Sequence, residues 1–300
     1  MSSRVGELLQ EGQHFLVHVF NTDQTINLKA VRKIKQRDVD ELKDASRRVE
    51  RYFWSQNVVQ CVFANRNDVL SSMVEMAKDY FDRESHPESL MQYAILEISR
   101  KFANTCSLFR SLLDHFDRYF KHSHGKDSQA YAEWKGLLSE EYDKWLSYRV
   151  VYMMRNYIQH YDMPPLHVSI HEVAIKEGIE TRFDIDMAAL RKDNEIRKKL
   201  EKTGDDKIDH IPLFRVLDEW SECVNRITNM AVKYRLEDAL PYAHVILGVR
   251  RELKVGDEGG LAPIWLPKVD RKPDKLSLSV GLLPEIKALH IVEEADRRAT

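Results

Sequence analysis

Cysteine and long apolar runs are both scarce in this chain. Its 300 residues include three cysteines, Cys61, Cys106 and Cys223, which are odd in number, far apart and without the paired spacing of metal ligands. Such usage is typical of reduced thiols in the cytoplasm. No apolar run approaches the length of a membrane-spanning helix, and the first residues, MSSRVGELLQEG, lack the apolar core of a signal peptide. We therefore expect a cytoplasmic protein that does not enter a membrane.

Net charge and nucleotide-binding fingerprints are scarce as well. The formal net charge is −2 and the isoelectric point is near 6.6. A general basic field for nucleic acid is therefore excluded, and any RNA contact must be a local patch. The glycine-rich segment GDEGG (256–260) lacks the Lys and Ser or Thr of a P-loop, and the hydrolase, zinc-protease and dinucleotide fingerprints are missing. We expect no cofactor.

Helical periodicity dominates what is present. Apolar residues recur at helical spacing in segments that together predict a mainly α fold, a helical bundle with a small β-hairpin inserted after its motif helix. The longest stripe predicts a central helix. The predicted helices cover residues 38–53, 67–80, 87–121, 128 to the motif, 186–190, 210–233, 236–249 and 281–295, with a charged stretch at 191–202.

Period-two alternation marks two other regions. Residues 166–185 alternate between apolar and polar and predict the hairpin, with its turn at 176–178. Residues 1–37 form either an N-terminal arm or a small hairpin, and 255–275 reads as a plain loop. We expect a bundle domain over 38–165, followed at 166–300 by the hairpin and C-terminal helices, packed on the bundle.

The stretch YRVVYMMRNYIQHYDMPP, residues 148–165, is the most informative part of the chain. One side of its helix is apolar, and Pro164 and Pro165 end it. The opposite side is too rich in hydrogen-bonding groups to be buried without partners, so we expect it to face water, a ligand or another chain. We call this side the polar face; its residues are Tyr148, Arg149, Tyr152, Arg155, Asn156, Gln159 and His160.

An Arg followed by a polar residue and then a His near the end of a helix resembles the Rx4-6H motif of the HEPN superfamily. Arg155, Asn156 and His160 match it. The preceding segment SLFRSLLDHFDRYF (107–120) and the run RNYIQHYDMPP together resemble bacterial HEPN-like proteins over roughly residues 40–190. The resemblance implies a bundle that pairs with a second copy to form one metal-independent ribonuclease site. It also suggests a toxin or defence effector with a regulatory protein partner.

RNA carries its own nucleophile, the 2′-hydroxyl, so cleavage needs a proton-transfer group and a cation at the phosphate. His160 suits proton transfer near neutral pH, and Arg155 suits the phosphate because its planar fork matches the oxygens. Asn156 lies one helical turn from His160 and is expected to orient the imidazole or donate to the phosphate. Weaker binding candidates are Gln159, Tyr152, Arg149 and Arg110.

Other patterns have plainer explanations. Arg110 and Asp114 are four apart, which favours an ordinary ion pair over a role in holding the polar face. His122 and His124 could in principle chelate a metal, but a lone HxH pair in a loop is weak evidence for a site. The strand residues His167 and His171 lie too far apart to share one zinc ion, so we expect no metal.

Two alternatives to an enzyme remain. The first is a non-catalytic helical module whose polar face binds a protein partner or a nucleotide, which the near-neutral charge favours. The second is a purely structural face, in which Arg155 pairs with a carboxylate and His160 caps a carbonyl.

Overall fold

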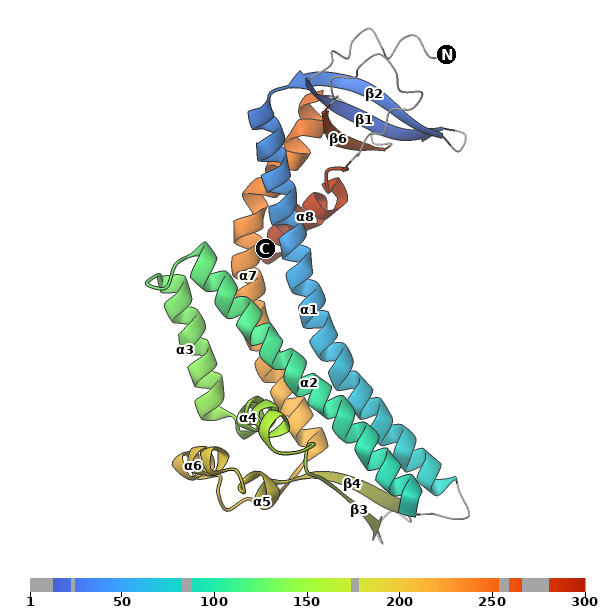
Figure 1. The fold of residues 1–300 in the computed structure, drawn as a ribbon, viewed down its shortest axis with the longest axis vertical. Helices are drawn as coiled ribbons and strands as arrows, with labels where there is room; N and C mark the ends of the chain where they lie inside the picture. Colours follow the sequence, from blue (N-terminus) through green and yellow to red (C-terminus); the bar gives the residue numbers. More distant parts are fainter. Residues whose placement is uncertain are drawn as a thin grey trace. The chain divides into compact units, whose positions relative to one another are not determined.

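The computed structural model describes residues 13–22, 25–82, 88–173, 178–253, 259–265 and 281–299. Most of these residues are helical, and two small three-stranded antiparallel sheets complete the fold, so the predicted mainly α class is confirmed (Figure 1). No helix in these ranges is both long and apolar enough to cross a membrane.

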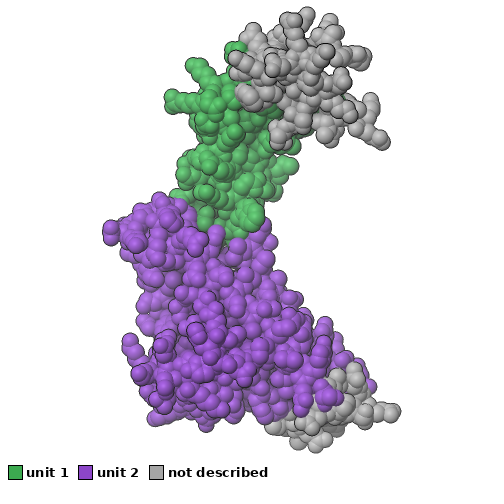
Figure 2. All heavy atoms as spheres, in the orientation of Figure 1, with its two compact units in different colours: residues 1–56, 232–300 green, residues 57–231 purple. Residues whose placement is uncertain are grey.

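The chain divides into two compact units, which Figure 2 shows in different colours. Unit 1 combines residues 1–56 with 232–300, and unit 2 is the continuous segment 57–231. This division falls at other points than the expected boundaries at 37 and 165, because both ends of the chain build the same sheet and core.

Unit 1 contains a sheet in the order β2-β1-β6. Strands β1 (His14–Thr22) and β2 (Thr25–Ile34) form an antiparallel hairpin, and β6 (Gly260–Trp265) pairs with the other edge of β1. The expectation of a plain loop at 255–275 is therefore wrong for residues 260–265. Strand β6 holds Pro263, whose missing N–H is tolerated because β6 is an edge strand.

Helical segments cover one face of this sheet. They are the first part of α1 (Gln36–Phe81), the last part of α7 (Leu213–Leu253), and α8 (Glu285–Ala299). Alternate residues of the strands face opposite sides, so β1 gives Leu16 to the helices and Phe15 and Val17 to the other face. The core against the helices includes Leu16, Val39, Leu42, Val49, Tyr52, Ala243, Ile246, Leu261, Ala288 and Ile291.

Unit 2 is a helical bundle with a hairpin. Helix α2 (Glu88–Ser123) packs against α3 (Gln129–Lys144) and α4 (Leu146–His160). Strands β3 (Leu166–Val173) and β4 (Gly178–Asp186) form the hairpin predicted after the motif helix, which is confirmed, and β5 (His210–Pro212) extends it to the order β3-β4-β5. Residues 174–177, where most of the predicted turn falls, lie outside the described ranges.

Aromatic side chains fill the centre of unit 2. Phe109 meets Trp220 edge to face with ring centroids 5.2 Å apart, and Phe120 stacks on Trp134 at 5.1 Å. All four are fully buried. The apolar stripe read along 87–121 therefore faces the core, as its periodicity predicts.

Short elements connect the hairpin to the bundle. Asp186 caps α5 (Met187–Leu190) by accepting from the N–H of Ala189 at 2.9 Å, as expected. Helix α6 (Asn194–Thr203) follows within the charged stretch and ends at Gly204 in the left-handed conformation.

Three predicted helix boundaries are wrong. Residues 38–53 and 67–80 belong to one helix, α1, and residues 210–233 and 236–249 belong mostly to one helix, α7. Conversely, the segment from Ser128 to the motif breaks at Trp145, whose backbone is extended (φ −115°, ψ 114°), giving α3 and α4.

Candidate functional site: the polar face of helix α4

Helix α4 carries the motif and ends where the sequence predicts. Its last residue is His160, and Tyr161 closes it by donating its N–H to the carbonyl of Tyr157 at 2.8 Å. The apolar side is buried at Val150, Val151 and Met154. Tyr161 is 56% exposed and stacks on Tyr157, with ring centroids 5.6 Å apart. It lies outside the helix, so helical periodicity no longer decides its direction.

The last two turns of α4 hold the four central motif residues. Arg155 and Asn156 are partly exposed, and Gln159 and His160 are exposed. Within the parts of the chain that the structure describes, no hydrogen bond or ion pair engages any of these four side chains. The purely structural alternative required such partners for Arg155 and His160. Their donors and acceptors are instead open to solvent and available to a ligand.

Arg149 departs from the expectation that it faces water or a ligand. It is only 4% exposed, and its guanidinium binds Asp205 through Nε at 3.0 Å and Nη2 at 2.6 Å. Its Nη1 donates to the backbone carbonyls of Tyr142 and Asp143 at 2.6 and 2.9 Å. These carbonyls lie in the last turn of α3 and lack partners within that helix. Arg149 therefore connects α3, α4 and the end of α6.

Arg110 and Tyr152 are brought together across α2 and α4. The guanidinium donates to the Tyr152 hydroxyl and lies 5.0 Å from the centre of its ring. The predicted ion pair with Asp114 is present at 3.3 Å. Arg110 therefore makes both the ordinary pair and a contact with the polar face, although not with Arg155 or His160.

An open pocket of about 660 Å³ lies beside Arg110 and Tyr152. Tyr142 and Tyr148 contribute two more aromatic rings, and Lys199 reaches it from α6. The motif residues Arg155, Asn156 and His160 do not line it. Sequence reasoning missed Tyr142 and Lys199, although the spacing of Tyr142, Tyr148 and Tyr152 places three tyrosines close together in the chain. The remaining lining residues are Leu113, Asp114, Asp117, Lys135, Leu138 and Ser139.

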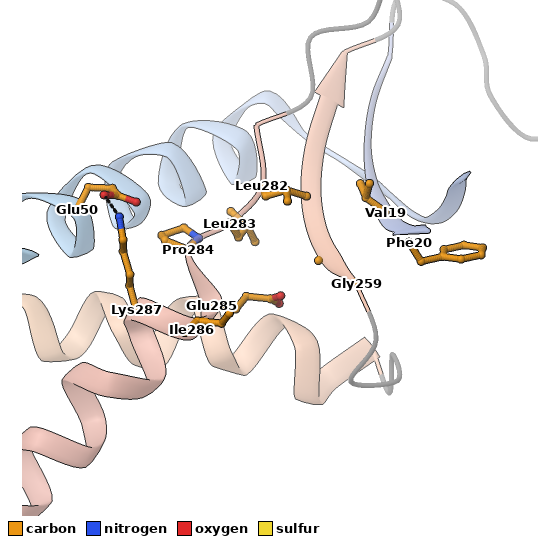
Figure 3. Close-up of a pocket in the computed structure, with 11 residues that line it drawn as sticks. Val19, Phe20, Glu50, Gly259, Leu282, Leu283, Pro284, Glu285, Ile286 and Lys287 are labelled. Atoms are coloured by element: carbon orange, nitrogen blue, oxygen red, sulfur yellow. Dashed lines mark hydrogen bonds and ion pairs between the residues drawn. The ribbon is translucent and has the colours of Figure 1, made fainter. Parts of the chain in front are cut away.

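Unit 1 has a separate pocket of about 820 Å³, shown in Figure 3. Its lining is largely apolar, with Val19, Leu282 and Ile286 among its residues. Its charged groups are paired with each other or with neighbours: Lys287 with Glu50, and Glu285 with Arg250 at 2.7 Å. Such pairing gives this pocket little chemistry of its own.

Metal ligands do not gather in the described part of the chain, where no group of three or more His, Cys, Asp or Glu side chains has the geometry to hold an ion. His124 contacts the Tyr119 hydroxyl at 3.2 Å. His167 lies near His210, with ring centroids 6.0 Å apart.

Comparisons with protein-family models, with curated proteins and with solved structures find no match to this chain.

Proposed function

We propose that the protein is a metal-independent endoribonuclease of the HEPN type. One observation carries the proposal: Arg155, Asn156, Gln159 and His160 lie together on the last two turns of α4, open to solvent and without partners among the described residues. Polar groups that serve a structural role in the interior are normally engaged by neighbours, as Arg149 is. Four free groups at one helix end, a guanidinium, two amides and an imidazole, are better explained by a ligand.

The reaction that suits these groups is cleavage of the RNA backbone by transfer of the phosphoryl group to the neighbouring 2′-oxygen. The 2′-oxygen forms a bond to the adjacent phosphorus, the bond from phosphorus to the 5′-oxygen breaks, and the products are a cyclic phosphate and a free 5′-hydroxyl. One group must take the proton from the 2′-hydroxyl and another must give a proton to the 5′-oxygen. Arg155 would stabilise the charge that develops on the phosphate oxygens.

A homodimer follows from this chemistry. One chain offers a single imidazole, His160, in its motif, whereas the reaction uses a base and an acid. Two copies that bring their motifs together supply two imidazoles and two guanidinium groups. The resemblance to the HEPN superfamily suggests the same arrangement. We expect the enzyme to act in the cytoplasm, as a toxin or defence effector under the control of a partner protein.

The test is cleavage of total cellular RNA by the purified protein with excess chelator present. Wild type is compared with His160→Ala and Arg155→Ala. The chain offers matched controls in His122 and Arg118, which are exposed on α2 and have no partner among the described residues. We expect chelator-resistant cleavage that both motif variants lose and that His122→Ala and Arg118→Ala retain. Full activity in a stably folded His160→Ala variant would contradict the proposal.

A second candidate is a non-catalytic module that binds a protein or a nucleotide through the same face. The net charge of −2 favours it, because affinity for nucleic acid depends on neutralising phosphates. The same assay separates the two. This candidate predicts no cleavage from any variant, together with a partner that wild type retains and Arg155→Ala loses in pull-down.

A further inference from the structure

The tyrosine pocket of unit 2 has the features of a nucleotide site. The Tyr142 and Tyr152 rings meet edge to face at 5.7 Å, and the Tyr148 and Tyr152 rings stack at 6.3 Å. Aromatic platforms beside cations are the usual means of holding unpaired bases, since every base has a face that stacks. The volume of about 660 Å³ lies within the range of about 300–1,000 Å³ that is common for small-ligand sites.

Three polar groups in this pocket, the hydroxyls of Tyr142 and Tyr148 and the ammonium of Lys199, have no hydrogen-bond or ion-pair partner among the described residues. Tyr148 is only 2% exposed, yet it lines the pocket and no hydrogen bond engages its hydroxyl. Its hydroxyl oxygen is not one of the fully buried atoms that lack a partner, so it opens onto the pocket and is available to a ligand. Burial raises the pKa of both Tyr142 and Tyr148, so both hydroxyls remain protonated donors at neutral pH.

One of the cationic side chains that line the pocket is not paired with a carboxylate. Arg110 is 3.3 Å from Asp114, and Lys135 is 3.8 Å from Asp117, which Lys121 also binds. Lys199 forms no ion pair with a carboxylate among the described residues. An incoming phosphate therefore meets one positive charge that no carboxylate of the pocket already neutralises.

We propose that this pocket binds an unpaired nucleotide of an RNA strand, with the base against the tyrosine rings and the phosphate at Lys199. The choice of RNA over other nucleotide ligands rests on the proposed function. Helix geometry supports it, because Tyr152 precedes Asn156 by about 6 Å and His160 by about 12 Å along the same helix. A strand held in the pocket thus continues along the free residues of α4.

The first experiment measures binding separately from cleavage. A fluorescent single-stranded RNA oligomer with 2′-O-methyl groups lacks the nucleophile, so its anisotropy reports affinity alone. We expect Tyr142→Ala to weaken binding about tenfold, since base stacking on one aromatic ring contributes roughly 1–3 kcal/mol. Tyr142→Phe retains the ring and should bind like wild type. Tyr93→Ala is the control, because Tyr93 is 67% exposed on α2 and lies outside this pocket.

The second experiment tests Lys199 through the dependence of affinity on salt. Each phosphate contact to a single strand contributes about 0.7 to the slope of log affinity against log salt. We expect Lys199→Ala to lower this slope by about 0.7. Lys198→Ala, the exposed neighbour on α6, should leave it unchanged. Because Lys199 is not part of the core, this variant tests the site without disturbing the fold.

Each outcome has a defined meaning. Equal affinity of wild type, Tyr142→Ala and Lys199→Ala for the oligomer overturns the pocket assignment, even if the protein cleaves RNA. Tyr142-dependent binding of adenosine monophosphate without binding of the oligomer also overturns it, in favour of a free-nucleotide site. Tyr142-dependent binding of the oligomer supports the pocket. If wild type then cleaves no RNA, the nuclease proposal alone fails.

Discussion

Arg149 of α4 and Asp205, just beyond α6, form a two-point ion pair with a nearest distance of 2.6 Å, and their side chains are only 5% and 14% exposed. Removing one partner of such a pair leaves the other charge without compensation in a poorly solvated place. We predict that Arg149→Ala lowers the free energy of unfolding by about 3–5 kcal/mol, measured by urea denaturation.

Arg197→Ala is the matched control for that loss. Arg197 lies on α6 and pairs with Glu201 at 3.7 Å, but both side chains are half exposed. We expect a change of no more than about 0.5 kcal/mol. If Arg149→Ala were equally mild, the pair would not hold α4 in place.

We predict that unit 1 is destabilised when Gly259 is replaced by alanine. Its φ is +80°, and a Cβ atom there would lie 2.1 Å from the carbonyl oxygen of Val19. Gly259→Ala should therefore lower the free energy of unfolding by at least about 1–3 kcal/mol. Gly248→Ala, in α7 with no atom within 4 Å of the added Cβ, should stabilise by about 0.5–1 kcal/mol. Thermal unfolding of the two variants gives opposite signs if this geometry is correct.

Glu219 links stability to pH. Partial burial acts to raise the pKa of its carboxyl, but hydrogen bonds from Ser147 at 2.6 Å and Arg215 at 2.7 Å outweigh burial and hold the pKa below 4.5. A carboxyl with a lowered folded pKa stabilises the protein above its unfolded pKa and loses this contribution as the pH falls through the folded pKa.

We therefore expect Glu219→Gln to be less stable than wild type at pH 7, by about 1–2 kcal/mol. The difference should shrink as the pH falls below 4.5. Thermal melts between pH 3 and pH 7, on the order of one every half unit, measure it. Glu222→Gln, exposed nearby on α7, is the control and should follow wild type throughout. A constant gap for Glu219→Gln would contradict the role of its ionised form.

The three thiols should differ sharply in reactivity. Cys61 is exposed, whereas Cys106 and Cys223 are fully buried, and burial raises the pKa of both buried thiols. The thiolate is the reactive form. We expect an alkylating reagent at neutral pH to modify Cys61 alone in the native protein and all three in denaturant, as intact mass measures. Rapid native labelling of Cys106 would show that α2 is not packed as described.

The sequence predicted those elements whose signals are local. The stripe of α2, the alternation of the β3–β4 hairpin and the cap at Asp186 are each contained in their own residues. The positions at which helices continue or break were harder to predict. Residues 54–66 contain no Pro or Gly, so nothing interrupts α1 there, whereas the helix breaks at Trp145 although residues 137–153 also contain neither.

The break at Trp145 depends on distant residues. Arg149 satisfies the last carbonyls of α3, and it is fixed in turn by Asp205, which lies 56 residues away. The strand β6 likewise forms only against β1. Contacts between distant residues also explain two errors at the site. The sequence grouped Arg149 with the free residues of α4, because its partner Asp205 could not be predicted. It also gave no sign that Tyr142 and Lys199 lie beside Tyr152, since the three residues belong to three different helices.

The strand order β2-β1-β6 has a consequence for synthesis of the chain. The central strand emerges from the ribosome early, but the strand that completes its second edge follows more than two hundred residues later. Unit 2, being continuous, has all its residues before that strand appears. The N-terminal hairpin therefore waits with one unpaired edge, the kind of surface that nascent chains expose to chaperones and to each other.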